Sequence, residues 1–258
     1  MIEEPYRWVE AIANRREYIE TQLAPGSAIV ALGCRDGILF VTVGQTRQKI
    51  FEIYDRIAMG AMGHPGDIER LRMAAIELAS AEGFARSAAD VSLRRLAHYS
   101  LSPVLKTAFE QVYGAPYLTK MLFAEVGATP EADLFLRIDY DGAIATNGGS
   151  VKAARQDFAV LAGMRQSTEA MESYLQREHQ PSATMERSLN AALNALARGR
   201  TGPADTTVEA DPSPEQITAE RKVQSETGIE AALLERDATT AIRYRPLTPE
   251  ELKQTARD

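Results

Sequence analysis

A chain of 258 residues with 45% hydrophobic and 25% charged residues can fold as one large domain or two small ones. Its formal net charge of -7 argues against a broad electrostatic contact with nucleic-acid phosphates, so we expect no nucleic-acid partner. Cys34 is the only cysteine, which excludes an internal disulfide and fits a reducing compartment. The sequence has no signal-peptide pattern and no apolar run near the roughly 20 residues of a membrane helix, so we expect a cytoplasmic protein without a membrane partner.

The first segment predicts a helix, and the next predicts two pairs of strands. Residues 8–23 place apolar side chains mostly at three- or four-residue steps, which predicts an amphipathic helix that Pro25 and Gly26 end. Asp36-Gly37 lies between two apolar runs and indicates a tight hairpin, because glycine tolerates the positive φ of such turns. The runs are continuously apolar, so we expect both faces of these strands to be covered. The four predicted strands are 28–34, 37–43, 49–56 and 57–63.

The remaining sequence predicts further helices and strands. A helix begins after Asp67, a good N-cap, and a second covers about 90–112, where Pro103 should kink or divide it. Residues 199–227 are rich in Pro, Thr, Asp and Glu and predict a long mobile loop. Thr248 and Pro249 begin a last helix. The other predicted strands are 117–127, 132–140, 142–146, 158–163, 228–237 and 239–246, and two more helices lie near 167–178 and 182–198.

The order of these elements predicts the fold class. Two sets of strands, each followed by a pair of helices, indicate two stacked sheets with helices outside, which buries both faces of each sheet. The sequence shows no internal repeat and no clear domain boundary. We therefore expect a single domain over residues 1–258.

Seven pieces of the chain carry a resemblance to a known family: PYRWVEAIANRRE, SAIVALGCRDGILFV, QKIFEIYDRIAMGAMG, IERLRMAAIELA, PYLTKMLFAEV, LRIDYDGAIA and FAVLAG. In this order and spacing they resemble a bacterial proteasome α-type subunit of the kind found in actinobacteria. The resemblance spans most of residues 5–250 and leaves out 147–157 and 199–227. It implies the N-terminal-nucleophile hydrolase fold, an α+β four-layer αββα sandwich. Its two stacked sheets are mainly antiparallel, and an extra N-terminal helix lies at 8–23.

The resemblance also implies where a catalytic site would lie. In the catalytic β-type subunits, an N-terminal threonine is the nucleophile, its freed amine helps as base, and a lysine and an aspartate tune the site. Ser27 and Lys49 stand at the threonine and lysine positions, but Val43 replaces the aspartate and Ala162 replaces a supporting serine. A hydroxyl needs a base within reach, and a well-patterned helix precedes Ser27, so we expect a non-catalytic subunit. The alternative is a self-processing N-terminal-nucleophile peptidase that uses Ser27.

The family's role is assembly and gating. Such subunits form heptameric rings that cap rings of catalytic β-type subunits, and ATPase rings or other activators dock on them. A ring that forms without β partners is the remaining possibility. The tail at 1–7 would close the axial pore through Glu3, Glu4, Pro5 and Tyr6, or it is a frayed terminus.

His64 stands where relatives carry a lysine that meets the terminal carboxylate of the activator, or it is an incidental loop histidine. Histidine, unlike lysine, is not always cationic at neutral pH, so activator docking would differ here. The three histidines are scattered and no phosphate-binding glycine motif occurs. We expect no metal and no cofactor.

Overall fold

Two antiparallel sheets of five strands lie face to face in the computed structural model, which describes residues 5–44, 46–111, 114–146, 156–201, 212–238 and 242–255. The strand order is β10-β9-β2-β1-β8 in sheet A and β3-β4-β5-β6-β7 in sheet B. Sheet A contains β1 (Ile29–Cys34), β2 (Gly37–Val43), β8 (Phe158–Leu161), β9 (Ile229–Glu235) and β10 (Tyr244–Pro246). Sheet B contains β3 (Ile50–Tyr54), β4 (Ile57–Gly63), β5 (Thr119–Glu125), β6 (Leu134–Ile138) and β7 (Ile144–Thr146).

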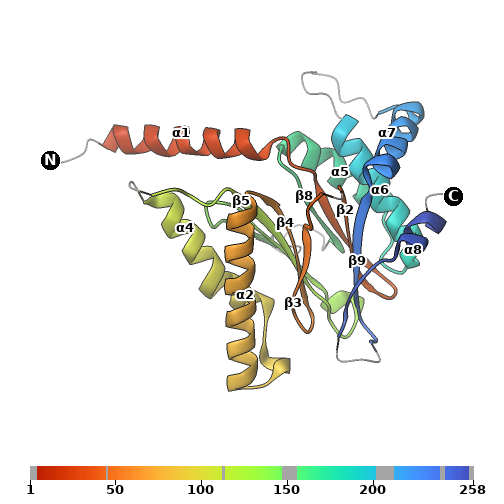
Figure 1. Ribbon diagram of the computed structural model, residues 1–258, viewed down its shortest axis with the longest axis horizontal. Coiled ribbons are helices and arrows are strands. Elements are labelled where there is room, and N and C mark those ends of the chain that lie inside the picture. The colour runs from red at the N-terminus through yellow and green to blue at the C-terminus, as the bar shows by residue number, and fades with distance from the viewer. Residues whose placement is uncertain are drawn as a thin grey trace.

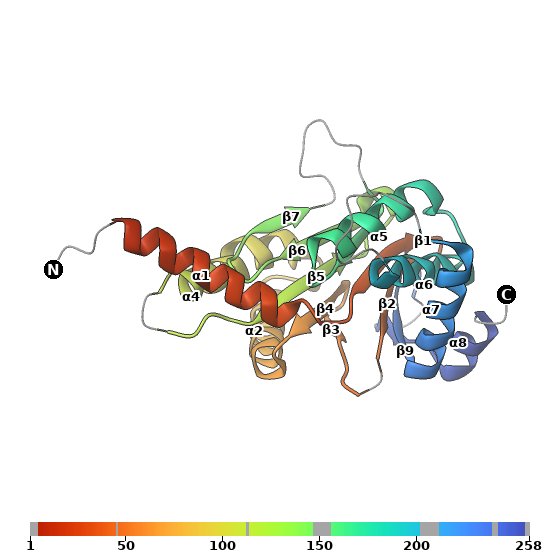
Figure 2. The ribbon, with the colours of Figure 1, turned by 90° about the horizontal axis from the view of Figure 1, so that it is seen from above.

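Helices cover the outer face of each sheet, so the predicted four-layer sandwich is confirmed (Figure 1). Sheet B carries α2 (Pro65–Ala85), α3 (Leu93–Arg95) and α4 (Ser102–Glu110), with 3-10 turns at Ala88–Asp90 and Pro130–Ala132. Sheet A carries α5 (Arg165–Glu178) and α6 (Met185–Thr201), with α7 (Pro214–Thr227) and α8 (Pro249–Thr255) against α6. Helix α1 (Pro5–Leu23) lies across one end of the sandwich, and its N-terminal half extends beyond the sheets (Figure 2). Within the described ranges, no helix is both long and apolar enough to cross a membrane.

The apolar core has three layers because successive side chains of a strand point to opposite faces of the sheet. In β1, Ile29 and Ala31 face sheet B, whereas Val30 and Leu32 face helices α5 and α6. This double burial explains why the strand sequences are continuously apolar instead of alternating. Cys34 lies in the layer between sheet A and its helices, fully buried, and that burial raises the pKa of its thiol.

Pro103 marks a change in the helix predicted over 90–112. Residues Leu96–Leu101 form a π-helix, and α4 begins at Ser102 with Pro103 in its first turn. A proline has no N–H to donate and its ring crowds the preceding turn, so the regular α-helical hydrogen bonding changes at this point. The chain therefore stays helical through Pro103, and what changes in the turn before the proline is the type of helix.

Three predictions for the bounds of elements are wrong. Helix α2 begins at Pro65 with His64 as its N-cap, so Asp67 lies in the first turn and does not cap the helix. The mobile loop over 199–227 is instead helical up to Thr201 in α6 and again throughout α7, with 202–211 outside the described residues. Ser213 begins α7 with a capping box, because its hydroxyl accepts from the N–H of Gln216 while the Gln216 side chain accepts from the N–H of Ser213. At the other end of the chain, α1 begins at Pro5 and not at residue 8, since proline is well suited to the first turn of a helix.

Candidate functional site

The four positions of the degenerate catalytic site come together at one end of sheet A. Ile29 pairs with Thr42 on one side and with Leu161 on the other. Ser27 lies two residues before β1. In this register it lies near the end of β2, whose last residue is Val43. Ala162 follows directly after β8 on the other side of β1. Lys49 reaches the same end through a hydrogen bond from its Nζ to the carbonyl oxygen of Val43, at 3.1 Å.

The contacts of Lys49 are structural ones. Position 43 carries no carboxylate that could orient the Lys49 ammonium. Its ammonium is half-buried and bonds a main-chain carbonyl, and burial lowers the pKa of Lys49 while the Glu230 carboxylate partly opposes this. Glu230 accepts hydrogen bonds from the backbone N–H groups of Lys49, at 3.0 Å, and Ile50, at 2.9 Å. The same carboxylate therefore joins β9 of sheet A to the start of β3 in sheet B. This arrangement holds the two sheets together.

The chain before Ser27 covers this end of the sandwich. A Cβ added at Gly163 would overlap the carbonyl oxygen of Leu23 and would lie 2.7 Å from that of Ala24, so the backbones are in close contact. Leu23 itself is buried against Phe109, Tyr140 and Ile19. The last turn of α1 is therefore packed closely against the fold.

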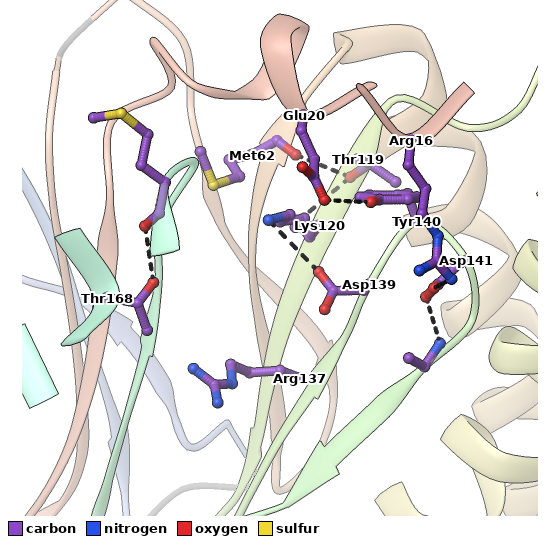
Figure 3. Close-up of polar contacts among 12 residues, drawn as sticks. Arg16, Glu20, Met62, Thr119, Lys120, Arg137, Asp139, Tyr140, Asp141 and Thr168 are labelled. Carbon is purple, nitrogen blue, oxygen red and sulfur yellow. Dashed lines mark hydrogen bonds and ion pairs between the residues drawn. The ribbon is translucent and has the colours of Figure 1, made fainter. Parts of the chain in front are cut away.

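Three polar side chains of α1 fix its position on the body, and Figure 3 shows two of them, Arg16 and Glu20. Arg15 donates to the carbonyl oxygens of Phe109, at 2.5 Å, and Gln111, at 2.7 Å, and so caps the negative end of α4. Arg16 forms an ion pair with Asp141 at 3.1 Å. Glu20 accepts a 2.8 Å hydrogen bond from the hydroxyl of Tyr140. Burial and the Glu20 carboxylate raise the pKa of Tyr140 well above its usual range, so this donor stays protonated at any physiological pH.

These anchoring residues were missed by the sequence interpretation, as was Glu230. The helical pattern of α1 marks its apolar stripe and gives no role to Arg15, Arg16 and Glu20. Their partners lie about a hundred residues away in the chain, in α4 and in the turn after β6. No spacing rule along the sequence indicates such a contact.

His64, Pro5 and Tyr6 belong to other elements than these four positions. His64 is exposed and precedes α2, and its backbone N–H donates to the carbonyl oxygen of Leu118 at 2.7 Å. Pro5 and Tyr6 are the first residues of α1, so they are not part of a preceding tail, whereas Glu3 and Glu4 lie outside the described residues. Within the part of the chain that the structure describes, no group of three His, Cys, Asp or Glu side chains could hold a metal ion.

Known proteins resemble this chain in sequence. A family model described as "Proteasome subunit" matches residues 24–206, a range that includes Ser27, Val43, Lys49, His64 and Ala162. The chain is 31% identical to a protein named Proteasome subunit alpha from Streptomyces avermitilis, over 95% of this chain and 86% of that protein. Proteins of the same name from Streptomyces coelicolor and a Nocardioides species are 33% identical over 75% of this chain and 72% of theirs, and 29% identical over 95% and 85%.

Proposed function

Because the chain belongs to the proteasome subunit family, as an α-type subunit of the bacterial kind, we propose that it forms the non-catalytic outer ring of a proteasome core particle. In this role a heptameric ring of the chain caps a ring of catalytic β-type subunits in the cytoplasm. The ring controls the entry of substrates for degradation and docks an ATPase ring or another activator. No cofactor or metal takes part.

One observation carries the non-catalytic part of this proposal: helix α1 is built into the end of the sandwich where a nucleophile would have to be exposed. Release of an N-terminal Ser27 would require removal of residues 1–26, and with them the contacts of Arg15, Glu20 and Leu23. A disposable segment has no need of such contacts. Val43 and Ala162 support the same conclusion, since neither side chain can accept or hold a proton.

Co-expression with the β-type subunit of the same genome tests the proposal. Electron microscopy of the purified particle should show this chain in outer rings on both sides of the catalytic rings, and its intact mass should be that of the full chain. A chain that lacks residues 1–26 would instead support the Ser27 peptidase. Ser27→Ala separates the two further, because the particle keeps its peptide hydrolysis if the β-type subunit does the chemistry and loses it if Ser27 does. Rings that form from this chain alone and ignore the β-type subunit would reject the core-particle role.

For the gate, we propose that the N-terminal residues through Tyr6 restrict the axial pore. Seven copies of Glu3 and Glu4 would bring carboxylates toward one axis, and salt screens their repulsion over about 8 Å. Core particles with full-length subunits should hydrolyse short peptides more slowly than particles that lack residues 1–4. Equal rates would reject a gate. Particles with Glu3→Gln and Glu4→Gln show whether the charge or the bulk of the tail matters.

For activator docking, we propose that His64 contacts the carboxylate at the end of an activator tail. The residue is exposed at the start of α2, so a tail can reach it. His64→Lys adds a permanent positive charge and should tighten the binding of a synthetic activator-tail peptide to the assembled particle. His98→Lys is the matched control, because His98 is also exposed but lies in the π-helix. Unchanged binding for His64→Lys would remove this residue from the pocket.

A further inference from the structure

Helix α2 leaves apolar side chains exposed toward the end that lies farthest from α1. Its start is next to α1, because the N–H of His64 donates to the carbonyl oxygen of Leu118, whose side chain packs against the cluster around Ile19 of α1. From there its 21 residues run for about 30 Å away from α1 (Figure 1). Phe84, near the end of the helix, is 96% exposed, and Leu78 is 44% exposed. This part of α2 therefore carries apolar surface that the fold itself does not bury.

A groove with a cavity of about 610 Å³ opens between this part of α2 and the π-helix Leu96–Leu101. Its volume lies within the range of about 300–1,000 Å³ that is usual for ligand pockets. Leu78, Leu96 and Tyr99 supply its apolar lining, and Tyr99 is 81% exposed. Short π-helices are rare and occur frequently at functional sites. An apolar side chain of another molecule can therefore insert between Leu78 and Tyr99.

The charged residues of the groove leave one cation without a partner. Arg95 forms an ion pair with Glu82 at 3.0 Å. Arg86 also lines the groove, is exposed, and has no ion pair among the described residues. The guanidinium of an arginine matches a carboxylate with two parallel hydrogen bonds, so Arg86 favours an acidic group from outside. The groove thus matches a partner that presents an apolar side chain with a carboxylate beside it.

The position of the groove indicates which molecule it faces. Helix α1 and His64, to which we assign the gate and the activator contact, lie at one end of the sandwich. The groove lies toward the other end, where Nη2 of Arg56 in the β3–β4 turn donates to the carbonyl oxygen of Ala89, in the turn after α2. In an outer ring, one end of each subunit faces the activator and the opposite end faces the ring that it caps. The groove would therefore face the catalytic ring.

We propose that this groove is the docking surface for a catalytic β-type subunit, which inserts an apolar side chain between Leu78 and Tyr99 and places a carboxylate beside Arg86. This docking role rests on the core-particle function proposed above, and it assigns the surface through which the two rings meet. Phe84 adds a second apolar contact at the end of α2. Aromatic and arginine side chains are typical anchors of protein interfaces.

A photo-crosslinking amino acid, p-benzoylphenylalanine, in place of Tyr99 identifies the neighbour of the groove in core particles co-expressed with the β-type subunit. The same amino acid in place of Val223 is the matched control, because Val223 is also exposed but lies on α7, toward the α1 end of the sandwich (Figure 1). Mass spectrometry of crosslinked peptides should find the β-type subunit attached at position 99 and not at position 223. Crosslinks from position 99 to another copy of this chain, or none in an assembled particle, would overturn the proposal.

Two substitutions separate the apolar part of the contact from the charged part. Leu78→Gln keeps a good helix former and removes the apolar anchor. In native mass spectrometry it should raise the concentration of β-type subunit for half-maximal assembly at least about tenfold. Arg86→Glu should raise it about fivefold at low salt and less at high salt, because salt screens an exposed charge. Lys222→Glu, an exposed change on α7, is the matched control and should have no effect.

The outcomes distinguish this docking surface from the core-particle role. If the parent chain does not assemble with the β-type subunit, the core-particle role fails and the docking surface fails with it. If the parent chain assembles and both Leu78→Gln and Arg86→Glu assemble as readily, the core-particle role stands and the docking surface is refuted. Circular dichroism and thermal melting of each variant confirm that the chain is still folded.

Discussion

Asp133 and Arg236 join the two sheets at the end of the sandwich opposite helix α1. The carboxylate oxygens lie 2.7 and 2.8 Å from Nη1 and Nη2 of the guanidinium, and the side chains of Asp133 and Arg236 are 1% and 6% exposed. Arg236 also donates to the carbonyl oxygen of Gly127 at 2.8 Å, and Asp133 accepts from the N–H of the same residue at 2.9 Å. Asp133→Leu leaves a buried guanidinium without its counter-charge, so we expect it to lower the free energy of unfolding by about 3–5 kcal/mol.

Urea unfolding followed by circular dichroism measures this loss. With a slope of about 3 kcal/mol per molar urea, the midpoint should fall by about 1–2 M. The double variant Asp133→Leu with Arg236→Met replaces both charges by apolar groups. Its free energy of unfolding should lie within about 1 kcal/mol of that of the parent protein. Glu169→Leu removes the partner of the exposed Arg165 and is the matched control, for which we expect an unchanged midpoint. A loss below about 1 kcal/mol for Asp133→Leu, or a double variant as unstable as the single one, would refute the reasoning, since it would mean that Arg236 stays solvated or finds another acceptor.

Three further predictions concern α1 and the half-buried His179. Gly163→Ala should lower the free energy of unfolding by about 1–3 kcal/mol in urea and speed proteolysis within α1, because its Cβ would overlap the backbone of Leu23. Arg15→Met should lower it by about 1 kcal/mol and raise deuterium uptake in α1 and at the end of α4, and unchanged uptake would contradict the capping role. Burial lowers the pKa of His179 to about 4 from 6.5, so the unfolded chain binds this proton more tightly than the folded one. The His179 contribution to stability should be complete above about pH 6.5 and fall by up to about 3 kcal/mol toward pH 4, whereas His179→Gln should remove this part of the slope in denaturation at a series of pH values.

Local signals in the sequence predicted most of the fold because the elements follow from short-range rules. Asp36-Gly37 places a hairpin, Pro103 follows a change from π-helix to α-helix, and Thr248 with Pro249 begins α8. Residues 214–227 were misread for the same reason, since their polar composition was taken as a loop although Ser213, Pro214 and Gln216 form a helix start. Composition is a weaker signal than the pattern of caps.

The site was only partly predictable, because its contacts cross the whole chain. The resemblance placed Val43 and Lys49 in one site, and the structure brings them into contact. Glu230, however, lies 181 residues from Lys49, and no sequence pattern indicates that it accepts from the backbone N–H groups of Lys49 and Ile50. The anchoring of α1 by Arg15 depends in the same way on where α4 ends. Such pairings follow from the stacking of the two sheets, which local patterns do not specify.

The burial of Cys34 makes the chain a ready scaffold for spectroscopy. Its thiol is fully buried and the pKa of that thiol is raised. Maleimide reagents need an accessible thiolate, so they should not react with Cys34 at neutral pH. A cysteine introduced at the exposed Val9 or Tyr18 of α1 would then be the single labelled position in each copy. A fluorophore there would report the motion of this helix in an assembled particle without removal of any native residue from the core.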